Sequence, residues 1–213
     1  MKLAIYGASG WIGGTVAAEA LNRDHFVTAI ARESSKVKLN HERLTVIIGD
    51  ATDHASVAKA VAGHDAIVAA IGGRREARHD VVPAAVRALL IGLSQADVKR
   101  LVWVGGAGSL EAEPGVMYID TPQFPAELKT EASAQVEALK LFRSSQEGIQ
   151  WSFLSPPAHL ERGLRSGRYR LGADQLLTDA NGDSRISVAD YAVALVDEIE
   201  RAAHIRRRFT VAY

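Results

Sequence analysis

The sequence predicts an α/β fold, a doubly wound parallel sheet with helices on both faces. Apolar runs of strand length alternate with segments of helical period along the whole chain. The runs 66–71 and 101–104 are apolar on both faces, as expected of strands buried between two helical layers. A glycine-rich turn also joins the first apolar run to the first helical segment.

The element order follows from these periods and from the turn residues between them. We predict strands at residues 2–6, 26–31, 44–48, 65–71, 100–105, 150–155 and 208–212. We predict helices at residues 11–23, 54–62, 80–96, 127–144 and 188–202. Asp80 and Ser187 precede two of these helices as candidate N-caps. Right-handed crossovers would then place a ligand at the carboxyl ends of the strands, near the switch point.

Length and composition narrow the class of protein. We expect one domain over 1–213, because 213 residues can bury a sizeable core. The 25 Lys and Arg residues balance 25 Asp and Glu residues, so we expect neither nucleic-acid nor membrane partners. The chain has no cysteine, which excludes thiolate catalysis and Cys-based metal sites, and we expect no metal. The sequence shows neither a signal-peptide core nor an apolar run of ~20 residues, so we expect a cytoplasmic protein. We expect it to be a monomer or a homodimer.

Two segments depart from the alternating pattern. Residues 106–126 and 156–187 are rich in glycine and proline, and both follow strands of the carboxyl half. Functional loops tend to occupy such positions. We therefore expect these segments to form the substrate side of the pocket.

The glycine-rich turn carries the clearest chemical signal. It reads Gly7-x-x-Gly10-x-x-Gly13 between a strand and a helix. One glycine permits the tight turn, one lets the backbone approach phosphates, and one lets helix and strand pack closely. The helix N-terminus then favours an anion. We predict a dinucleotide pyrophosphate here, and hence an NAD(P)-binding Rossmann fold, with the turn residues Gly7, Ser9, Gly10, Trp11, Ile12 and Gly13 in contact.

Residues after the second strand bear on the choice of coenzyme. Arg32 ends this strand, where NADP sites place an arginine for the 2′-phosphate, and Lys36 follows one turn later. Glu33 offers the alternative, because a carboxylate there would bond the ribose 2′-hydroxyl of NAD. We predict NADP(H) in preference to NAD(H).

Further candidate cofactor contacts come from the ends of later strands. Asp50 lies where an adenine amino group is expected. For Thr52 and Asp53, a purely structural role in a turn and a helix N-cap is an equally good interpretation. The remaining predicted contacts are Ala51, Ile71, Gly72, Gly105, Gly106, Ser155 and Pro156.

These blocks together resemble a known family. The chain is similar to the NADH-flavin reductase group of atypical short-chain dehydrogenases, relatives of biliverdin reductase B and NmrA-like proteins. The similarity rests on Gly7–Gly13, Val104–Leu110, Leu154–Pro156, Gly167–Gly172 and Ser184–Ala192. It implies the Rossmann fold and a nicotinamide cofactor, and it leaves the substrate open.

The usual catalytic pair of short-chain dehydrogenases is missing. That pair is a Tyr with a Lys four residues later, but Tyr118, Tyr169 and Tyr191 are followed there by Pro, Ala and Leu. Hydride transfer to a flavin needs mainly stacking and orientation, because the flavin ring spreads the charge. We therefore expect an NAD(P)H-dependent oxidoreductase acting on FMN, FAD or a quinone-like acceptor. The alternatives are a non-catalytic NADP(H)-sensing regulator and a sugar epimerase or ketone reductase.

Four side chains are the candidates for chemistry in the pocket. Ser109 is either a hydrogen-bond donor near the nicotinamide or a turn serine. Tyr118 and Lys129 flank the first irregular segment, where Lys129 can hold a ribose or an anion or lie on the surface. His159 follows the sixth strand as a possible donor. An arginine group in the second segment (Arg162, Arg165, Arg168 and Arg170) fits a solvated hairpin edge better than an anion site.

Overall fold

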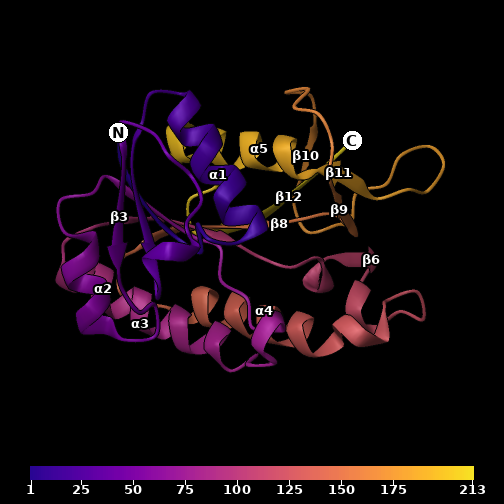
Figure 1. Cartoon of the computed structure of the whole chain (residues 1–213). Coiled ribbons are helices and arrows are strands. Elements are labelled where there is room, and N and C mark those ends of the chain that lie inside the picture. Colours follow the sequence, from indigo (N-terminus) through magenta and orange to yellow (C-terminus); the bar gives the residue numbers. More distant parts are fainter.

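The computed structural model describes residues 1–74 and 76–213 and contains a large sheet between two layers of helices (Figure 1). Its long strands are β1 (Lys2–Tyr6), β2 (Phe26–Ala31), β3 (Leu44–Ile48), β4 (Ala66–Ala69), β5 (Arg100–Val104), β8 (Gln150–Ser155) and β12 (Arg207–Ala212). With the short strand β10 (Arg170–Gly172) they form the order β10-β12-β8-β5-β4-β1-β2-β3. Only β10 is antiparallel to its neighbour. The predicted doubly wound α/β fold is confirmed.

The order of the strands positions the site. From β1 the chain adds β2 and β3 on one side, and then returns to place β4 on the other side of β1. The connections that leave β1 and β4 therefore diverge to opposite faces of the sheet. In open α/β sheets, ligands bind in the crevice that this divergence opens at the carboxyl ends of the strands.

Two helical layers bury the sheet (Figure 1). Helices α1 (Trp11–Asn22) and α5 (Val188–Arg201) cover one face, and α2 (His54–Val61), α3 (Val81–Gln95) and α4 (Lys129–Ser144) cover the other. The central strands β4 and β5 are buried along their whole length, which explains their unbroken apolar sequence. The bounds predicted for the long strands and helices agree with the structure to within two residues.

Two of the three candidate N-cap residues make a capping hydrogen bond. The Ser187 hydroxyl accepts a hydrogen bond from the Asp190 N–H at 3.0 Å and so caps α5. The Asp53 carboxylate caps α2, which confirms the N-cap interpretation of this residue. Asp80 stands before α3 but makes no capping bond: its backbone is already helical, and its carboxylate pairs with Arg78 at 3.2 Å.

A charged network lies inside the carboxyl half of the fold. The guanidinium of Arg100 on β5 bonds Glu198 on α5 at 2.6 Å, and both side chains are under 10% exposed. Ser152 donates to the same Glu198 oxygen at 2.8 Å, and His204 lies 2.7 Å from the other oxygen. Burial alone would raise the pKa of Glu198, but the bonds from His204 and Ser152 and the charge of Arg100 hold it below its usual value.

The two irregular segments contain short strands that we did not predict. In the first, β6 (Glu111–Glu113) and β7 (Val116–Met117) form a hairpin. In the second, β9 (His159–Glu161) pairs in parallel with β11 (Arg185–Ser187). These strands have two or three residues each, too few to show a hydrophobic period. Among the described residues no helix has the length and apolar character needed to cross a membrane.

Candidate functional site

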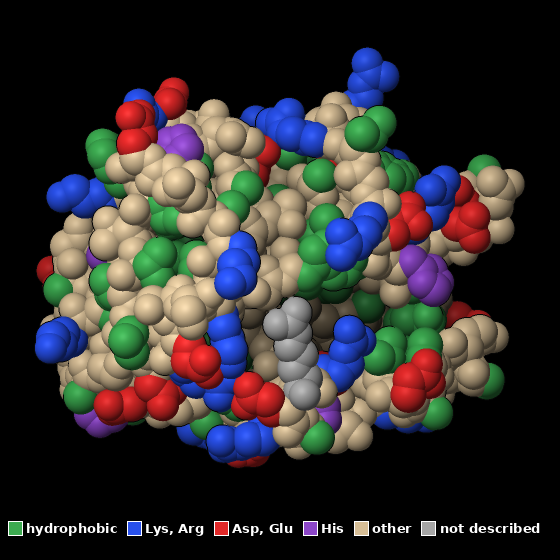
Figure 2. Space-filling view, in the orientation of Figure 1, with side chains coloured by type: hydrophobic (Ala, Val, Ile, Leu, Met, Phe, Trp, Pro, Cys, Tyr) green, Lys and Arg blue, Asp and Glu red, His purple; other side chains and the backbone are tan. Residues whose placement is uncertain are grey.

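A cavity of about 770 Å³ opens along the carboxyl edge of the sheet. Figure 2 shows a hollow on this face of the molecule, with several Lys and Arg side chains around it. The residues that directly follow six parallel strands all line the cavity: Gly7, Arg32, Gly49, Ala70, Gly105 and Pro156. Its size lies within the usual range for small-molecule and cofactor sites. The site therefore lies where the strand order predicts a ligand.

The glycine loop forms the part of this cavity next to α1. Gly7 has a φ of +81°, and the Gly10 N–H donates to the Gly7 carbonyl at 2.9 Å, which closes the turn. A Cβ atom on Gly13 would lie 2.2 Å from the Gly7 oxygen, so only glycine fits there. Gly10 occupies the N-cap of α1 without a side-chain cap. The first N–H groups of α1 are consequently available to an anion.

The structure brings nearly all predicted cofactor contacts to one cavity. Those that line it are Gly7, Ser9, Gly10, Trp11, Ile12, Gly13, Arg32, Asp50, Ala51, Ile71, Gly72, Gly105, Gly106 and Pro156. The exception is Ser155, which is fully buried at the end of β8 and does not line the cavity. Because β8 is covered on both faces, its last side chain packs inside the fold. The backbone contact expected for Ser155 stays a prediction.

The end of the cavity near β2 carries two paired cations. The Arg32 guanidinium makes a two-pronged ion pair with Glu76, with one N···O distance of 3.0 Å. This pairing raises the pKa of Arg32 further above its usual value. Lys36 bonds the Glu33 carboxylate at 2.6 Å. Glu33, the residue that would favour NAD, is thus paired with Lys36. Glu76 is paired with Arg32, the residue predicted to bind a 2′-phosphate.

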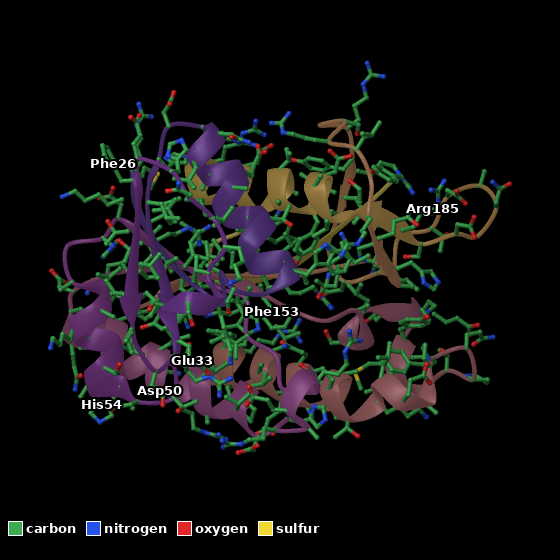
Figure 3. All side chains as sticks on the ribbon, in the orientation of Figure 1. Phe26, Glu33, Asp50, His54, Phe153 and Arg185 are labelled. Atoms are coloured by element: carbon green, nitrogen blue, oxygen red, sulfur yellow. The ribbon has the colours of Figure 1, made fainter. Side chains whose placement is uncertain are left out.

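Two polar groups mark the same end of the cavity. The Asp50 carboxylate accepts from the Thr52 N–H at 2.8 Å and from its hydroxyl at 2.7 Å, and these bonds lower the pKa of Asp50. Figure 3 labels Asp50 and Glu33, which follow the paired strands β3 and β2. Tyr6 lines the cavity with a buried hydroxyl that has no hydrogen-bond partner among the described residues. Burial and the Asp50 charge raise the pKa of Tyr6, so it remains a hydrogen-bond donor.

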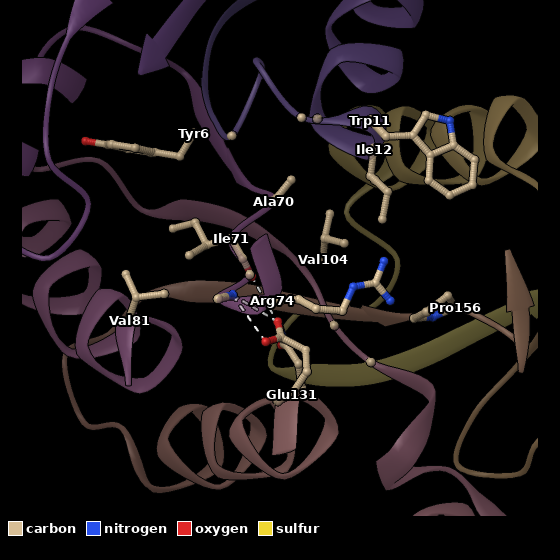
Figure 4. Close-up of a pocket in the computed structure, with 18 of the residues that line it drawn as sticks. Tyr6, Trp11, Ile12, Ala70, Ile71, Arg74, Val81, Val104, Glu131 and Pro156 are labelled. Carbon is tan, nitrogen blue, oxygen red and sulfur yellow. Dashed lines mark hydrogen bonds between the residues drawn. The ribbon is translucent and has the colours of Figure 1, made fainter. Parts of the chain in front are cut away.

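Helix α4 presents two residues to the cavity that sequence reasoning missed. The Glu131 carboxylate accepts from the Gly73 N–H at 3.1 and 3.2 Å and contacts His79 at 2.6 Å, as Figure 4 shows in part. Gln135 accepts from the indole N–H of Trp103 at 2.9 Å and donates to the Ile71 carbonyl at 3.1 Å.

Glu131 and Gln135 are four positions apart, the spacing that a Tyr–Lys pair would use on one helix face. The apolar period of residues 127–144 predicts a helix with one buried side, but it does not show which residues face a ligand. Among the described residues, no group of three or more His, Cys, Asp or Glu side chains is placed to hold a metal.

The opposite end of the cavity is apolar and aromatic. Tyr118 and Phe124 pack edge to face with ring centroids 5.0 Å apart. Leu128, Ala132, Pro157 and Leu160 add apolar surface. His159 also lines this end, in the first position of β9. Two of the four candidate catalytic residues, Tyr118 and His159, therefore reach the cavity, and their roles stay predictions.

The other two candidate catalytic residues lie elsewhere. Ser109 is buried, and both its carbonyl and its hydroxyl accept hydrogen bonds from Arg208, at 3.1 and 3.3 Å. Ser109 therefore helps to hold β12 in the interior of the fold. Lys129 is the exposed first residue of α4 and does not line the cavity. Neither residue lines the cavity, and the pocket roles expected for Ser109 and Lys129 stay untested predictions.

A strand–glycine loop–helix unit beside a switch-point cavity defines a dinucleotide-binding protein of the Rossmann class. The chain belongs to the NAD(P)H-binding family, whose model matches residues 7–199. This membership confirms the class of cofactor expected from the glycine loop. The resemblance to NADH-flavin reductases is also supported by the solved structures described next.

Three relatives resemble the chain over nearly all of its length. The uncharacterized protein YwnB of Bacillus subtilis (strain 168) is 41% identical over 99% of this chain and 98% of its own. A "putative epimerase" structure from Bacteroides thetaiotaomicron is 37% identical, with a TM-score of 0.92 over 100% and 96% of the two chains. A "putative NADH-flavin reductase" structure from Streptococcus pneumoniae TIGR4 is 33% identical, with a TM-score of 0.85 over 100% and 99%.

Proposed function

We propose that this protein is an NADPH-dependent oxidoreductase that transfers hydride to a flavin or a quinone-like acceptor. The observation that carries the proposal is the composition of one continuous cavity. It runs from the glycine loop to an apolar end with the Tyr118–Phe124 pair. The cavity-facing positions of α4 are Glu131, Ala132 and Gln135, and they include no acid–base Tyr and Lys pair. Such a site suits planar acceptors whose reduction needs little proton catalysis.

The residues present fit a dinucleotide. The uncapped N-terminus of α1 suits the pyrophosphate, and the unpartnered Tyr6 hydroxyl and the Asp50 carboxylate suit the adenosine. When bound, NADPH would supply the hydride. Gly105 and Gly106 would present only backbone beside the nicotinamide, and a Cβ on Gly105 would lie 2.0 Å from the Phe153 ring, so this turn needs glycine there.

The chain's own contribution to the proposed reaction is to hold the acceptor and exclude water. The aromatic pair and the apolar residues around it favour a flat, poorly solvated ring. The balance is one hydride from NADPH and one proton from solvent, which together give NADP⁺ and the two-electron-reduced acceptor. No buried acid is needed for this balance, because solvent can deliver the proton after the hydride has moved.

The choice of coenzyme provides one test. We expect Arg32→Ala to weaken NADPH binding about tenfold and to leave NADH binding nearly unchanged, because the guanidinium would contact only the 2′-phosphate. Glu76→Gln should strengthen NADPH binding, because it releases Arg32 from its ion pair. Isothermal titration with both coenzymes measures this. Unaltered NADPH binding in Arg32→Ala would overturn the preference for NADP(H).

A steady-state assay tests the reaction itself. We expect NADPH oxidation above the uncatalysed rate with FMN, FAD, riboflavin or menadione as acceptor. Absence of turnover with every acceptor, together with equal, tight binding of NADP⁺ and NADPH, would replace the proposal with a non-catalytic sensor. Turnover of a nucleotide sugar or a ketone would instead support an epimerase or reductase, despite the missing Tyr–Lys pair.

A further inference from the structure

The cations around the cavity differ in whether a carboxylate already neutralises them. Among the described residues, four Lys and Arg side chains line the cavity, and three have partners: Arg32 pairs with Glu76, Lys36 with Glu33, and Arg78 with Asp80. The side chain of the fourth, Arg74, makes no ion pair or hydrogen bond with any described residue. Arg74 therefore contributes an uncompensated positive charge to the cavity.

Two carboxylates close to Arg74, one in Figure 4 and one in the chain, are already engaged. Arg74 begins the short helix η2 (Arg74–Glu76), directly after Gly73. The Glu131 carboxylate below it is occupied by the Gly73 N–H and by His79. Glu76, two residues along, is bound to Arg32. The local carboxylates are thus paired with other groups, and the Arg74 guanidinium keeps its full set of donors for a ligand.

The direction of the Arg74 side chain indicates which end of the cavity it serves. In Figure 4 it extends away from Tyr6 and Val81 and toward Pro156. Pro156 begins the segment that continues into Pro157, His159 and Leu160, which line the apolar end. The unpaired cation therefore lies toward the acceptor end of the cavity, where the neighbouring surface is mostly apolar.

We propose that Arg74 recognises a negative charge on the acceptor, so that the site takes planar aromatic acceptors that carry a phosphate or a carboxylate. This inference rests on the proposed function. The apolar end would receive the ring, and the guanidinium would bind the anion through parallel N–H···O bonds. Of the two sources of a phosphate at this position, the acceptor and the pyrophosphate of the dinucleotide, we assign the acceptor.

FMN and riboflavin make a matched pair for the test, because they share one ring system and differ by a phosphate. We expect the wild-type protein to reduce FMN with a kcat/KM about 10- to 100-fold above that for riboflavin. Arg74→Ala should remove most of this difference by raising the KM for FMN, while riboflavin turnover and the KM for NADPH stay the same. Arg74→Lys should restore part of the preference for FMN, since lysine keeps the positive charge but lacks the two parallel N–H donors of the guanidinium.

Arg87→Ala is the control, because Arg87 lies on α3 outside the cavity, in an exposed pair with Glu137. It should leave both flavins unaffected. Equal FMN and riboflavin kinetics in the wild type, or equal losses for both in Arg74→Ala, would overturn the proposal. A loss of NADPH affinity with an unchanged flavin ratio would assign Arg74 to the dinucleotide instead.

The proposed function can fail separately from the role of Arg74. If no flavin is reduced, flavin fluorescence titration of the protein saturated with NADP⁺ decides the matter. Tighter binding of FMN than riboflavin that disappears in Arg74→Ala would support the anion site without the reaction. Equal binding of the two flavins, or none, would overturn the anion site as well.

Discussion

Glu198→Ala is expected to lower the free energy of unfolding by about 3–5 kcal/mol, because it leaves the Arg100 guanidinium buried without its counter-charge. Ser152 and His204 would lose the same acceptor. Denaturant or thermal unfolding measures the loss. Glu137→Ala is the matched control, since this carboxylate pairs with Arg87 at the surface and should contribute less than about 1 kcal/mol. Equal effects of the two substitutions would contradict the assignment.

The same network predicts a dependence on pH. The pKa of Glu198 is lower in the folded protein than its ordinary value of 4.5. Its stabilising contribution is therefore complete above pH 4.5 and is lost as the pH falls through the folded-state pKa. The difference in stability between the wild type and Glu198→Gln should shrink as the pH falls below 4.5. A difference that stays constant down to the acid transition would contradict this.

Gly13→Ala is expected to weaken NADPH binding at least about tenfold, which corresponds to about 1.4 kcal/mol. The added Cβ would lie 2.2 Å from the Gly7 carbonyl oxygen, so the turn or the start of α1 must move. Overpacking of this kind also lowers stability by about 1–3 kcal/mol. Titration with NADPH and thermal unfolding measure the two effects.

A control must separate the loss of binding from a loss of stability. Gly115 lies in the β6–β7 hairpin with a φ of +78° and open space around it, and it does not line the cavity. Gly115→Ala should cost about 1–2 kcal/mol of stability for its left-handed backbone but leave NADPH affinity unchanged. If Gly115→Ala weakens NADPH binding as much as Gly13→Ala does, the glycine loop has no specific role.

The part of the site that sequence could predict consists of local backbone features. Gly7, Gly10 and Gly13 define a turn whose geometry depends on a few neighbouring residues. Arg32 directly follows β2 and Asp50 is the second residue after β3, and parallel strands bring their carboxyl ends to one edge. The bounds of the long elements likewise follow from hydrophobic patterns of four or more residues.

The remaining part depends on contacts between residues far apart in the sequence. The side chains of Ser109 and Arg208, 99 positions apart, meet in the interior, and this contact takes Ser109 away from the cavity. Glu76 reaches Arg32 across 44 positions and occupies the group predicted to select NADP(H). Neither contact can be detected in the sequence, because neither depends on a hydrophobic period or on neighbouring residues.

The sequence by itself thus determined the doubly wound fold, the dinucleotide loop and the absence of a Tyr–Lys pair. The tertiary structure alone decided which side chains face the cavity, namely Glu131 and Gln135 but not Lys129 or Ser109. It also decided which cations are already paired, and so left Arg74 uncompensated among the described cations of the cavity. The physical reason is that strand and helix formation depends on local periodicity, whereas side-chain pairing depends on packing across the completed sheet.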